Sequence, residues 1–170
     1  MTDKKPLSGR IAAVTGGTGG IGKAICERFW REGATVYALD RATIDLNGID
    51  VLKMDVTDPK QVDMAFGQIA EQSEKLDILV NAAGIEIEKT IEDTSLEEWN
   101  HIFAINVTGT FLASKSALPL MRKSGGGSII NFGSYDGFIA DPGLAAYCAT
   151  KGAVHALTKA MACDYGPEGI

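Results

Sequence analysis

The feature that most constrains this chain is a glycine-rich turn that joins a short apolar run to a helical pattern. The run Ile11 to Val14 predicts a buried parallel strand, and the segment Thr15 to Gly22 contains five glycines. The apolar residues after the turn recur at the spacing of one helix face: Ile21, Ile25, Phe29 and Trp30. Glycine lets a backbone approach a phosphate closely, and the first turn of a helix offers free N–H groups. The pattern therefore predicts a phosphate-binding turn, although a tight connection between two elements would look the same.

Composition limits the classes of protein that remain. The 170 residues suffice for one domain, expected to span 1–170, and shares of 45% hydrophobic and 22% charged residues are ordinary for a globular protein. A net charge of -6 argues against a nucleic-acid surface and provides no basic patch for a membrane. The segment Met1 to Gly9 is polar, without the apolar core of a signal peptide, and no apolar run is long enough to span a bilayer. We therefore expect neither a nucleic-acid nor a membrane partner.

The three cysteines of the chain are Cys26, Cys148 and Cys163, which are scattered and lack the spacing of a metal site. An odd number of separated thiols is typical of a protein in a reducing compartment. We therefore expect a cytoplasmic protein that holds no metal ion.

Apolar runs and helical patterns alternate through the rest of the chain. Four further strands are predicted at 35–39, 51–54, 77–80 and 128–132. Helices are predicted from Pro59 after an Asp58 N-cap, from the capping box at Ser95 to about Arg122, and from about Ala145 to Tyr165. The linker 41–48 is too short for a full crossover helix. Strands that alternate with helices predict an α/β fold with a doubly wound, parallel, Rossmann-like sheet.

Ligands of such a sheet bind beyond the carboxyl ends of its strands, and every predicted end carries small or polar residues. In chain order, these ends hold the glycine turn, Asp40, Asp55-Val56, Asn81-Ala82-Ala83-Gly84 and Gly133-Ser134. Asp40 stands where an acidic side chain binds the adenosine ribose hydroxyls and repels a 2′-phosphate, which predicts NAD as the cofactor. Taken alone, Asp55 is better explained as an ordinary loop residue. Together, the five ends suit a dinucleotide that lies along the sheet edge.

Tyr147 and Lys151 are the candidates for chemistry, because positions i and i+4 share one face of a helix. A phenol has a pKa of about 10, and lowering it by roughly three units needs about 4 kcal/mol. A neighbouring ammonium, helped by the charge of an oxidised nicotinamide, is expected to supply much of this. A chance surface pair would give the same spacing. His101 and His155 are the alternative bases, both expected on helix faces.

Taken together, these motifs resemble the short-chain dehydrogenase/reductase family. The resemblance rests on Thr15-Gly-Gly-Thr-Gly-Gly-Ile-Gly22, Asn81-Ala-Ala-Gly84, Asn106, Ser134 and Tyr147-Cys-Ala-Thr-Lys151, in the family's order and spacing. It implies an NAD(P)-dependent alcohol–ketone oxidoreductase with Tyr147 as general acid/base. It also implies that Ser134 hydrogen-bonds the reacting oxygen and that Asn106 holds a water in a proton relay. Lys151 would bind the nicotinamide ribose and lower the pKa of Tyr147.

The resemblance also assigns the cofactor site. By analogy, Asp55 and Val56 would contact adenine, and Asn81 and Gly84 would border the cofactor. The full expected NAD site comprises Gly16, Thr18, Gly20, Ile21, Gly22, Asp40, Asp55, Val56, Asn81, Ala82, Gly84, Tyr147 and Lys151. Members of the family commonly form dimers or tetramers through the helices that correspond to the one from Ser95 and the one around Tyr147. A homodimer or homotetramer is therefore expected.

Two departures from the family pattern bear on these expectations. The short linker after Asp40 removes most of a helix on the adenosine side. Family members also continue past the position of Ile170, so the resemblance implies a chain that is short at its C-terminus, lacks the last strands and has the fifth strand at an uncovered edge. We expect an oxidoreductase that transfers a hydride between NAD(H) and a secondary alcohol or ketone. The alternatives are a nucleotide-binding module without turnover and an inactive fragment of such an enzyme.

Overall fold

The computed structural model describes residues 5–170, so the first four residues of the polar N-terminal segment lie outside the described residues. Five strands form one sheet in the order β3-β2-β1-β4-β5, and every neighbouring pair is parallel. The strands are β1 (Ile11–Thr15), β2 (Thr35–Asp40), β3 (Asp50–Lys53), β4 (Ile78–Asn81) and β5 (Ser128–Asn131). The predicted doubly wound, Rossmann-like fold is confirmed, and the strand order reverses between β1 and β4, where such sheets bind their ligands.

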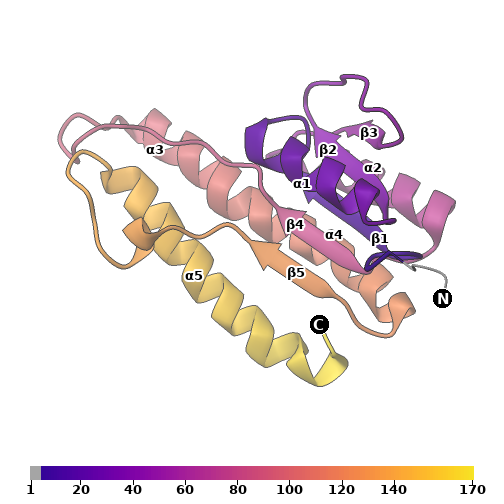
Figure 1. Ribbon diagram of the computed structural model, residues 1–170. Coiled ribbons are helices and arrows are strands. Elements are labelled where there is room, and N and C mark those ends of the chain that lie inside the picture. Colours follow the sequence, from indigo (N-terminus) through magenta and orange to yellow (C-terminus); the bar gives the residue numbers. More distant parts are fainter. Residues whose placement is uncertain (1–4) are drawn as a thin grey trace.

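Helices cover both faces of the sheet (Figure 1). They are α1 (Gly20–Arg31), α2 (Pro59–Ser73), α3 (Leu96–Phe103), α4 (Thr110–Ser124) and α5 (Ala145–Tyr165). On one face, α2 and α4 contribute Phe66 and Met121 to the larger apolar core. On the other face, α1 contributes Cys26 to a second core. Between them, Ala13 and Val14 of β1 are 0% exposed, which explains why β1 is an uninterrupted apolar run.

The predicted helix starts and the short linker are confirmed. Asp58 caps α2 by accepting the N–H groups of Lys60 and Gln61. Ser95 and Glu98 form the expected capping box at the start of α3. The linker between β2 and β3 contains no helix, so β3 follows β2 through irregular chain.

The prediction of a single long helix from Ser95 to about Arg122 is wrong for the middle of that segment. A π-helical segment, η1 (Ala104–Gly109), separates α3 from α4. Within it Asn106 and Gly109 are both buried, and a Cβ atom on Gly109 would lie 2.8 Å from Cγ2 of Val56. A wider turn of this kind often marks a functional position, and apolar periodicity does not reveal it.

Strand β5 forms one edge of the sheet, in agreement with the sequence analysis. Ile130 of β5 is 43% exposed, whereas the strands on the inside of the sheet are largely buried. Helix α5 runs beside β5 (Figure 1), and the Asn131 amide donates to the Thr158 hydroxyl at 2.9 Å. This bond fixes α5, which carries Tyr147 and Lys151, relative to the end of the sheet.

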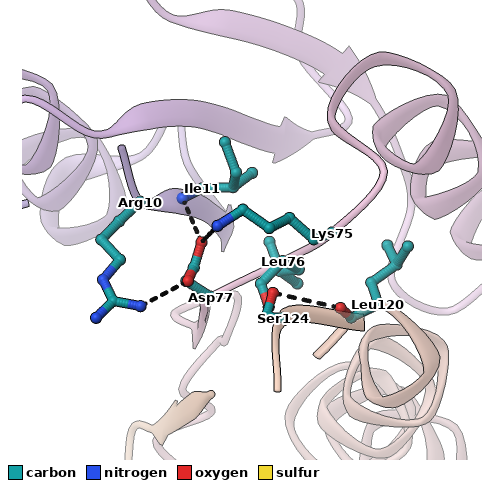
Figure 2. Close-up of polar contacts among 7 residues, drawn as sticks. All are labelled: Arg10, Ile11, Lys75, Leu76, Asp77, Leu120 and Ser124. Atoms are coloured by element: carbon teal, nitrogen blue, oxygen red, sulfur yellow. Dashed lines mark hydrogen bonds and ion pairs between the residues drawn. The ribbon is translucent and has the colours of Figure 1, made fainter. Parts of the chain in front are cut away.

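A buried carboxylate ties β1 to β4 at their amino ends (Figure 2). Asp77 accepts the backbone N–H of Ile11 at 2.9 Å and pairs with Arg10 at 2.7 Å and Lys75 at 3.2 Å. Burial of the Asp77 carboxyl alone would raise its pKa, but these three donors outweigh it and hold the pKa below its usual range. The central strand pair is thereby anchored at the edge opposite the glycine turn. Beside it, Ser124 of α4 donates to the carbonyl of Leu76 at 2.8 Å.

Candidate active site

The glycine turn between β1 and α1 is packed so closely that side chains are excluded at several positions. Gly16 has a φ of +65°, and a Cβ atom on it would lie 2.9 Å from the backbone of Ala83. A Cβ atom on Gly22 would lie 2.1 Å from the carbonyl oxygen of Gly16. Helix α1 begins after Gly19, and no side chain caps its first N–H groups. This is the local geometry that binds a phosphate at a helix N-terminus.

Asp40, at the end of β2, supports the same turn. Its Oδ2 accepts the backbone N–H of Thr18 at 3.1 Å. At the end of β3, Asp55 accepts the N–H and the hydroxyl of Thr57 at 2.9 and 2.7 Å. Burial of the Asp55 carboxyl opposes its ionisation, but the Thr57 bonds and the charge of Arg41 lower its pKa below the usual value. Asp55 therefore organises its loop, and its contact with adenine stays a prediction.

A cleft of about 500 Å³ lies beyond the carboxyl ends of β1 to β4. Nine of the predicted cofactor residues line it, namely Gly16, Gly20, Ile21, Gly22, Asp40, Asp55, Val56, Ala82 and Gly84. Thr18, Asn81, Tyr147 and Lys151 do not line this cleft. The structure therefore brings together residues from four strand ends that are up to 68 positions apart in the chain (16 to 84).

Asn81, at the end of β4, is turned into the protein interior. Its amide donates to Ser114 of α4 at 3.0 Å and to Asn131 of β5 at 2.8 Å. The adjacent loop is held by Thr15, whose hydroxyl accepts the N–H of Ala83 at 3.1 Å. Asn81 thus stabilises the strand ends on which the cleft is built, and a direct cofactor contact by its side chain stays a prediction.

Asn106, in the π-helical segment, connects the cleft wall to α5. Its Oδ1 accepts the N–H of Ile85, and its Nδ2 donates to the carbonyl of Ile85, both at 2.9 Å. Nδ2 also donates to the Thr150 hydroxyl at 3.1 Å, and Thr150 in turn donates to the carbonyl of Tyr147. The side-chain amide is thus fully engaged, so Asn106 sets the spacing between the cleft and Tyr147. A water held by Asn106 stays a prediction.

Ser134, Tyr147 and Lys151 come together at the end of β5, beside this connection. The Lys151 ammonium lies 5.4 Å from the centroid of the Tyr147 ring. It donates at 2.7 Å to the carbonyl of Phe132, so it is bonded to the chain after β5 and not to the phenol. Burial lowers the pKa of Lys151, and the nearby Glu86 carboxylate opposes that effect.

The pKa of Tyr147 departs from the sequence-based expectation. Burial raises it, a hydrogen bond with Ser134 acts in the opposite direction, and the Glu86 and Asp136 carboxylates raise it further. The expected lowering by Lys151 is therefore not found in the chain by itself, because burial and two negative charges act against the phenolate. A phenolate at neutral pH needs an additional positive charge, such as that of an oxidised nicotinamide.

The two alternative bases lie on helices, as expected. His101 of α3 lines the cleft. The ring of His155 stacks on Phe138 with the centroids 4.1 Å apart. A Cβ atom on Gly133 would lie 2.1 Å from its Nε2, so His155 packs against the loop that carries Ser134. Neither imidazole hydrogen-bonds Tyr147.

Sequence reasoning missed three residues of the site: Glu86, Asp136 and Thr150. Thr150 lies inside the motif from Tyr147 to Lys151, but its partner Asn106 is 44 positions away and no spacing rule connects them. Residues 5–170 contain no group of three or more His, Cys, Asp or Glu side chains arranged to hold a metal ion. Over the same range, none of the helices combines the length and the hydrophobicity needed to cross a membrane.

The chain belongs to the short-chain dehydrogenase family, whose model matches residues 10–170. A cyclopentanol dehydrogenase of Comamonas testosteroni is 41% identical over 175 residues, covering 96% of this chain and 70% of that protein. An NADP-dependent (R)-specific alcohol dehydrogenase of Lentilactobacillus kefiri is 39% identical over 175 residues, covering 96% of this chain and 69% of that protein.

The solved structures agree in fold. The ligand-free aldohexose dehydrogenase of Thermoplasma acidophilum matches with a TM-score of 0.92 and 38% identity. The match covers 96% of this chain and 64% of that chain. This chain therefore spans 64% to 70% of the length of these three proteins.

Proposed function

We propose that this chain is an oxidoreductase that transfers a hydride between NAD(H) and a secondary alcohol or its ketone, with Tyr147 as general acid/base. The observation that carries the proposal is the pairing of two features at one sheet edge. A cleft follows the strand ends, and the group of Ser134, Tyr147 and Lys151 lies beside it. Asn106 joins the two, since it bonds both Ile85 of the cleft wall and α5.

The residues of the cleft fit a dinucleotide cofactor. A Cβ atom on Gly20 would meet no atom within 4 Å, so the space in front of the α1 N-terminus is open to a pyrophosphate. Asp40 accepts the Thr18 N–H at Oδ2 and the Ala42 N–H at Oδ1, at 3.1 and 3.4 Å, and each carboxylate oxygen keeps a further lone pair for a ribose hydroxyl. When bound, the nicotinamide supplies the hydride chemistry that no side chain provides.

The remaining chemistry falls to the side chains at the end of β5. The hydroxyl of Tyr147 gives a proton to the substrate oxygen in reduction and takes it back in oxidation. Ser134, next to Tyr147, hydrogen-bonds that oxygen and holds it near the phenol. Lys151 contributes a positive charge and a donor for a ribose, and Asn106 keeps the loop of Ile85 at a fixed distance from α5.

The proposal is tested with the purified chain, NAD⁺ and a panel of secondary alcohols that includes cyclopentanol and aldohexoses, the compounds in the names of two relatives. Formation of NADH with at least one alcohol is the expected result. Binding of NADH without turnover of any alcohol or ketone would favour the alternative of a nucleotide-binding module. Absence of both binding and turnover would favour an inactive fragment.

We expect the chain to prefer NAD(H) to NADP(H). The Asp40 carboxylate beside the turn should repel a 2′-phosphate, Gly19 adds no compensating charge, and Arg41 is the one feature that favours NADP. Asp40→Ala should weaken the preference, chiefly by improving NADPH binding. The dissociation constants of NADH and NADPH, measured by fluorescence for both proteins, check this. Tighter binding of NADPH by the unmodified chain would contradict it, and the named NADP-dependent relative makes that a real alternative.

We further propose a homodimer or homotetramer that pairs through α4 and α5. Phe111 of α4 is 46% exposed and borders a hollow of about 440 Å³ that Leu157 and Met161 of α5 also line. Phe111→Glu should therefore shift the chain toward monomer, because it places a charge in an apolar contact. Light scattering at micromolar concentration measures this. Ile91→Glu is the control, since Ile91 is 72% exposed and outside the hollow. If the unmodified chain is a monomer, packing within one chain explains the apolar residues on α4 and α5.

We also propose a cytoplasmic location. Cys26 is buried, Cys148 is half-buried and Cys163 is exposed, and all three are free thiols. Separated free thiols are typical of a reducing compartment. Burial raises the pKa of Cys26 to about 12, so this thiol is not a reactive thiolate.

A further inference from the structure

Asp136 is a buried acidic residue next to the proposed acid/base. It lies in η2 (Tyr135–Gly137), one turn of 3-10 helix directly after Ser134, and is 7% exposed. The Ser134 hydroxyl donates to Oδ2 of Asp136 at 2.9 Å, and the N–H of Asp136 donates back to Oγ of Ser134 at 3.2 Å. The two residues therefore fix each other's position.

Ser134 has one hydroxyl proton, and several acceptors compete for it. A hydrogen bond from Ser134 to Tyr147 would favour the phenolate and lower the pKa of Tyr147. A carboxylate is a stronger acceptor than a neutral phenol or a ketone. In this structure the proton goes to Asp136, and a phenolate on Tyr147 would have to take it away from that carboxylate.

The charge of Asp136 has no neutralising partner among residues 5–170. Its Oδ1 is buried without a hydrogen-bond partner, and the ion pairs in that range do not include it. A buried charge acts over several ångströms because the surrounding dielectric is low. Asp136 therefore opposes a second negative charge on the neighbouring phenol.

We propose that Asp136 is a positioning residue that holds the Ser134 proton and thereby keeps Tyr147 in its protonated, acid form. The inference rests on the proposed role of Tyr147 and deepens it. A site of this kind donates protons readily at neutral pH, which favours ketone reduction. Oxidation of alcohols then needs a higher pH, at which the phenol ionises.

Other charged and titratable groups also face Tyr147. Glu86, from the loop after β4, and Cys148, from α5, raise its pKa in the same direction as Asp136. The Lys151 ammonium, on α5, is 5.4 Å from the ring. Of the two carboxylates that act on Tyr147, Asp136 hydrogen-bonds Ser134 and Glu86 does not. This difference lets the experiment separate a relayed effect from charge alone.

The direct test is an NMR titration of the chain with ¹³C at Cζ of its four tyrosines. Tyr147→Phe assigns the Tyr147 signal. Asp136→Asn keeps the size of the side chain, removes the charge, and lets its amide donate to Ser134 so that the hydroxyl proton is released. The Tyr147 signal should then titrate at a lower pH than in the unmodified chain. An unchanged midpoint overturns the proposal, and Asp136→Ser repeats the measurement if the asparagine variant does not fold.

Two further variants identify the route. Asp141→Asn removes a carboxylate from the same loop, but Asp141 bonds the Tyr135 hydroxyl and raises the pKa of Tyr135 to about 12. The Asp141→Asn variant should therefore change the pH at which the Tyr135 signal titrates and leave that of the Tyr147 signal unchanged. In a Ser134→Ala background, Asp136→Asn should shift Tyr147 less than it does alone, because the relay is gone. Equal shifts in both backgrounds, or a Tyr147 shift from Asp141→Asn, would overturn the role of Ser134.

Kinetics separate this inference from the proposed function. In Asp136→Asn, the pH profile of alcohol oxidation should move to lower pH, and oxidation below the midpoint should be about fivefold faster, the equivalent of one hydrogen bond. If the NMR shift is found but no alcohol is oxidised, the proposed function fails and the inference about Asp136 stands. If oxidation is found but neither midpoint moves, the inference fails and the function stands.

Discussion

Tyr147→Phe is expected to lower turnover by about 10²- to 10⁴-fold while NADH affinity stays near that of the unmodified chain. Phenylalanine keeps the ring that packs on α5 and loses only the ionisable oxygen. Because the phenolate is the base in oxidation and burial raises the pKa of Tyr147, the oxidation rate of the unmodified chain should rise with pH. Steady-state rates across pH, measured beside an NADH fluorescence titration, check both parts.

The matched control for this prediction is Tyr165→Phe, at the end of the same helix. It should leave turnover and its pH dependence unchanged, since Tyr165 is remote from Ser134 and Lys151. Lys151→Ala should reduce both turnover and NADH affinity, because it removes a charge beside the phenol and a donor for the ribose. Turnover in Tyr147→Phe equal to that of the unmodified chain would move the base elsewhere. His101, which lines the cleft, would then be tested first.

The layers of the fold could be predicted because local and global signals agree. β1 reads as an apolar run since both of its faces are buried, and Asp58 and Ser95 mark helix starts through bonds to residues only a few positions away. The π-helical break between α3 and α4 could not be predicted. Its buried Gly109 packs closely against Val56, and these two residues are 53 positions apart in the chain (56 to 109).

The site divides in the same way. Residues at strand ends, such as Gly16 and Asp40, were predictable because the topology of a parallel sheet brings those ends together. The direction in which the pKa of Tyr147 is shifted could not be predicted, because it depends on burial and on Asp136, a residue that no motif marks. Spacing on a helix places Lys151 near the ring, but it does not show that the ammonium bonds Phe132.

Three glycine-to-alanine variants should separate the fold of the turn from its role in binding. A Cβ atom on Gly22 would lie 2.1 Å from the backbone oxygen of Gly16, which cannot move without distorting the turn. We expect Gly22→Ala to lower the free energy of unfolding by about 2 kcal/mol or more. NADH binding should be lost as well. Urea unfolding and fluorescence titration measure the two effects, and a stable variant with normal affinity would contradict the close packing.

Gly20→Ala is the sharper member of the series, because Gly20 lines the cleft and a Cβ atom on it would meet no atom within 4 Å. The variant should unfold like the unmodified chain but bind NADH roughly tenfold or more weakly, since the methyl group takes the place of a pyrophosphate oxygen. Gly67→Ala is the control: Gly67 lies in α2, also without an atom within 4 Å, and should gain up to about 1 kcal/mol of stability with unchanged binding. Normal NADH affinity in Gly20→Ala would place the phosphates elsewhere and remove the main support for a cofactor in this cleft.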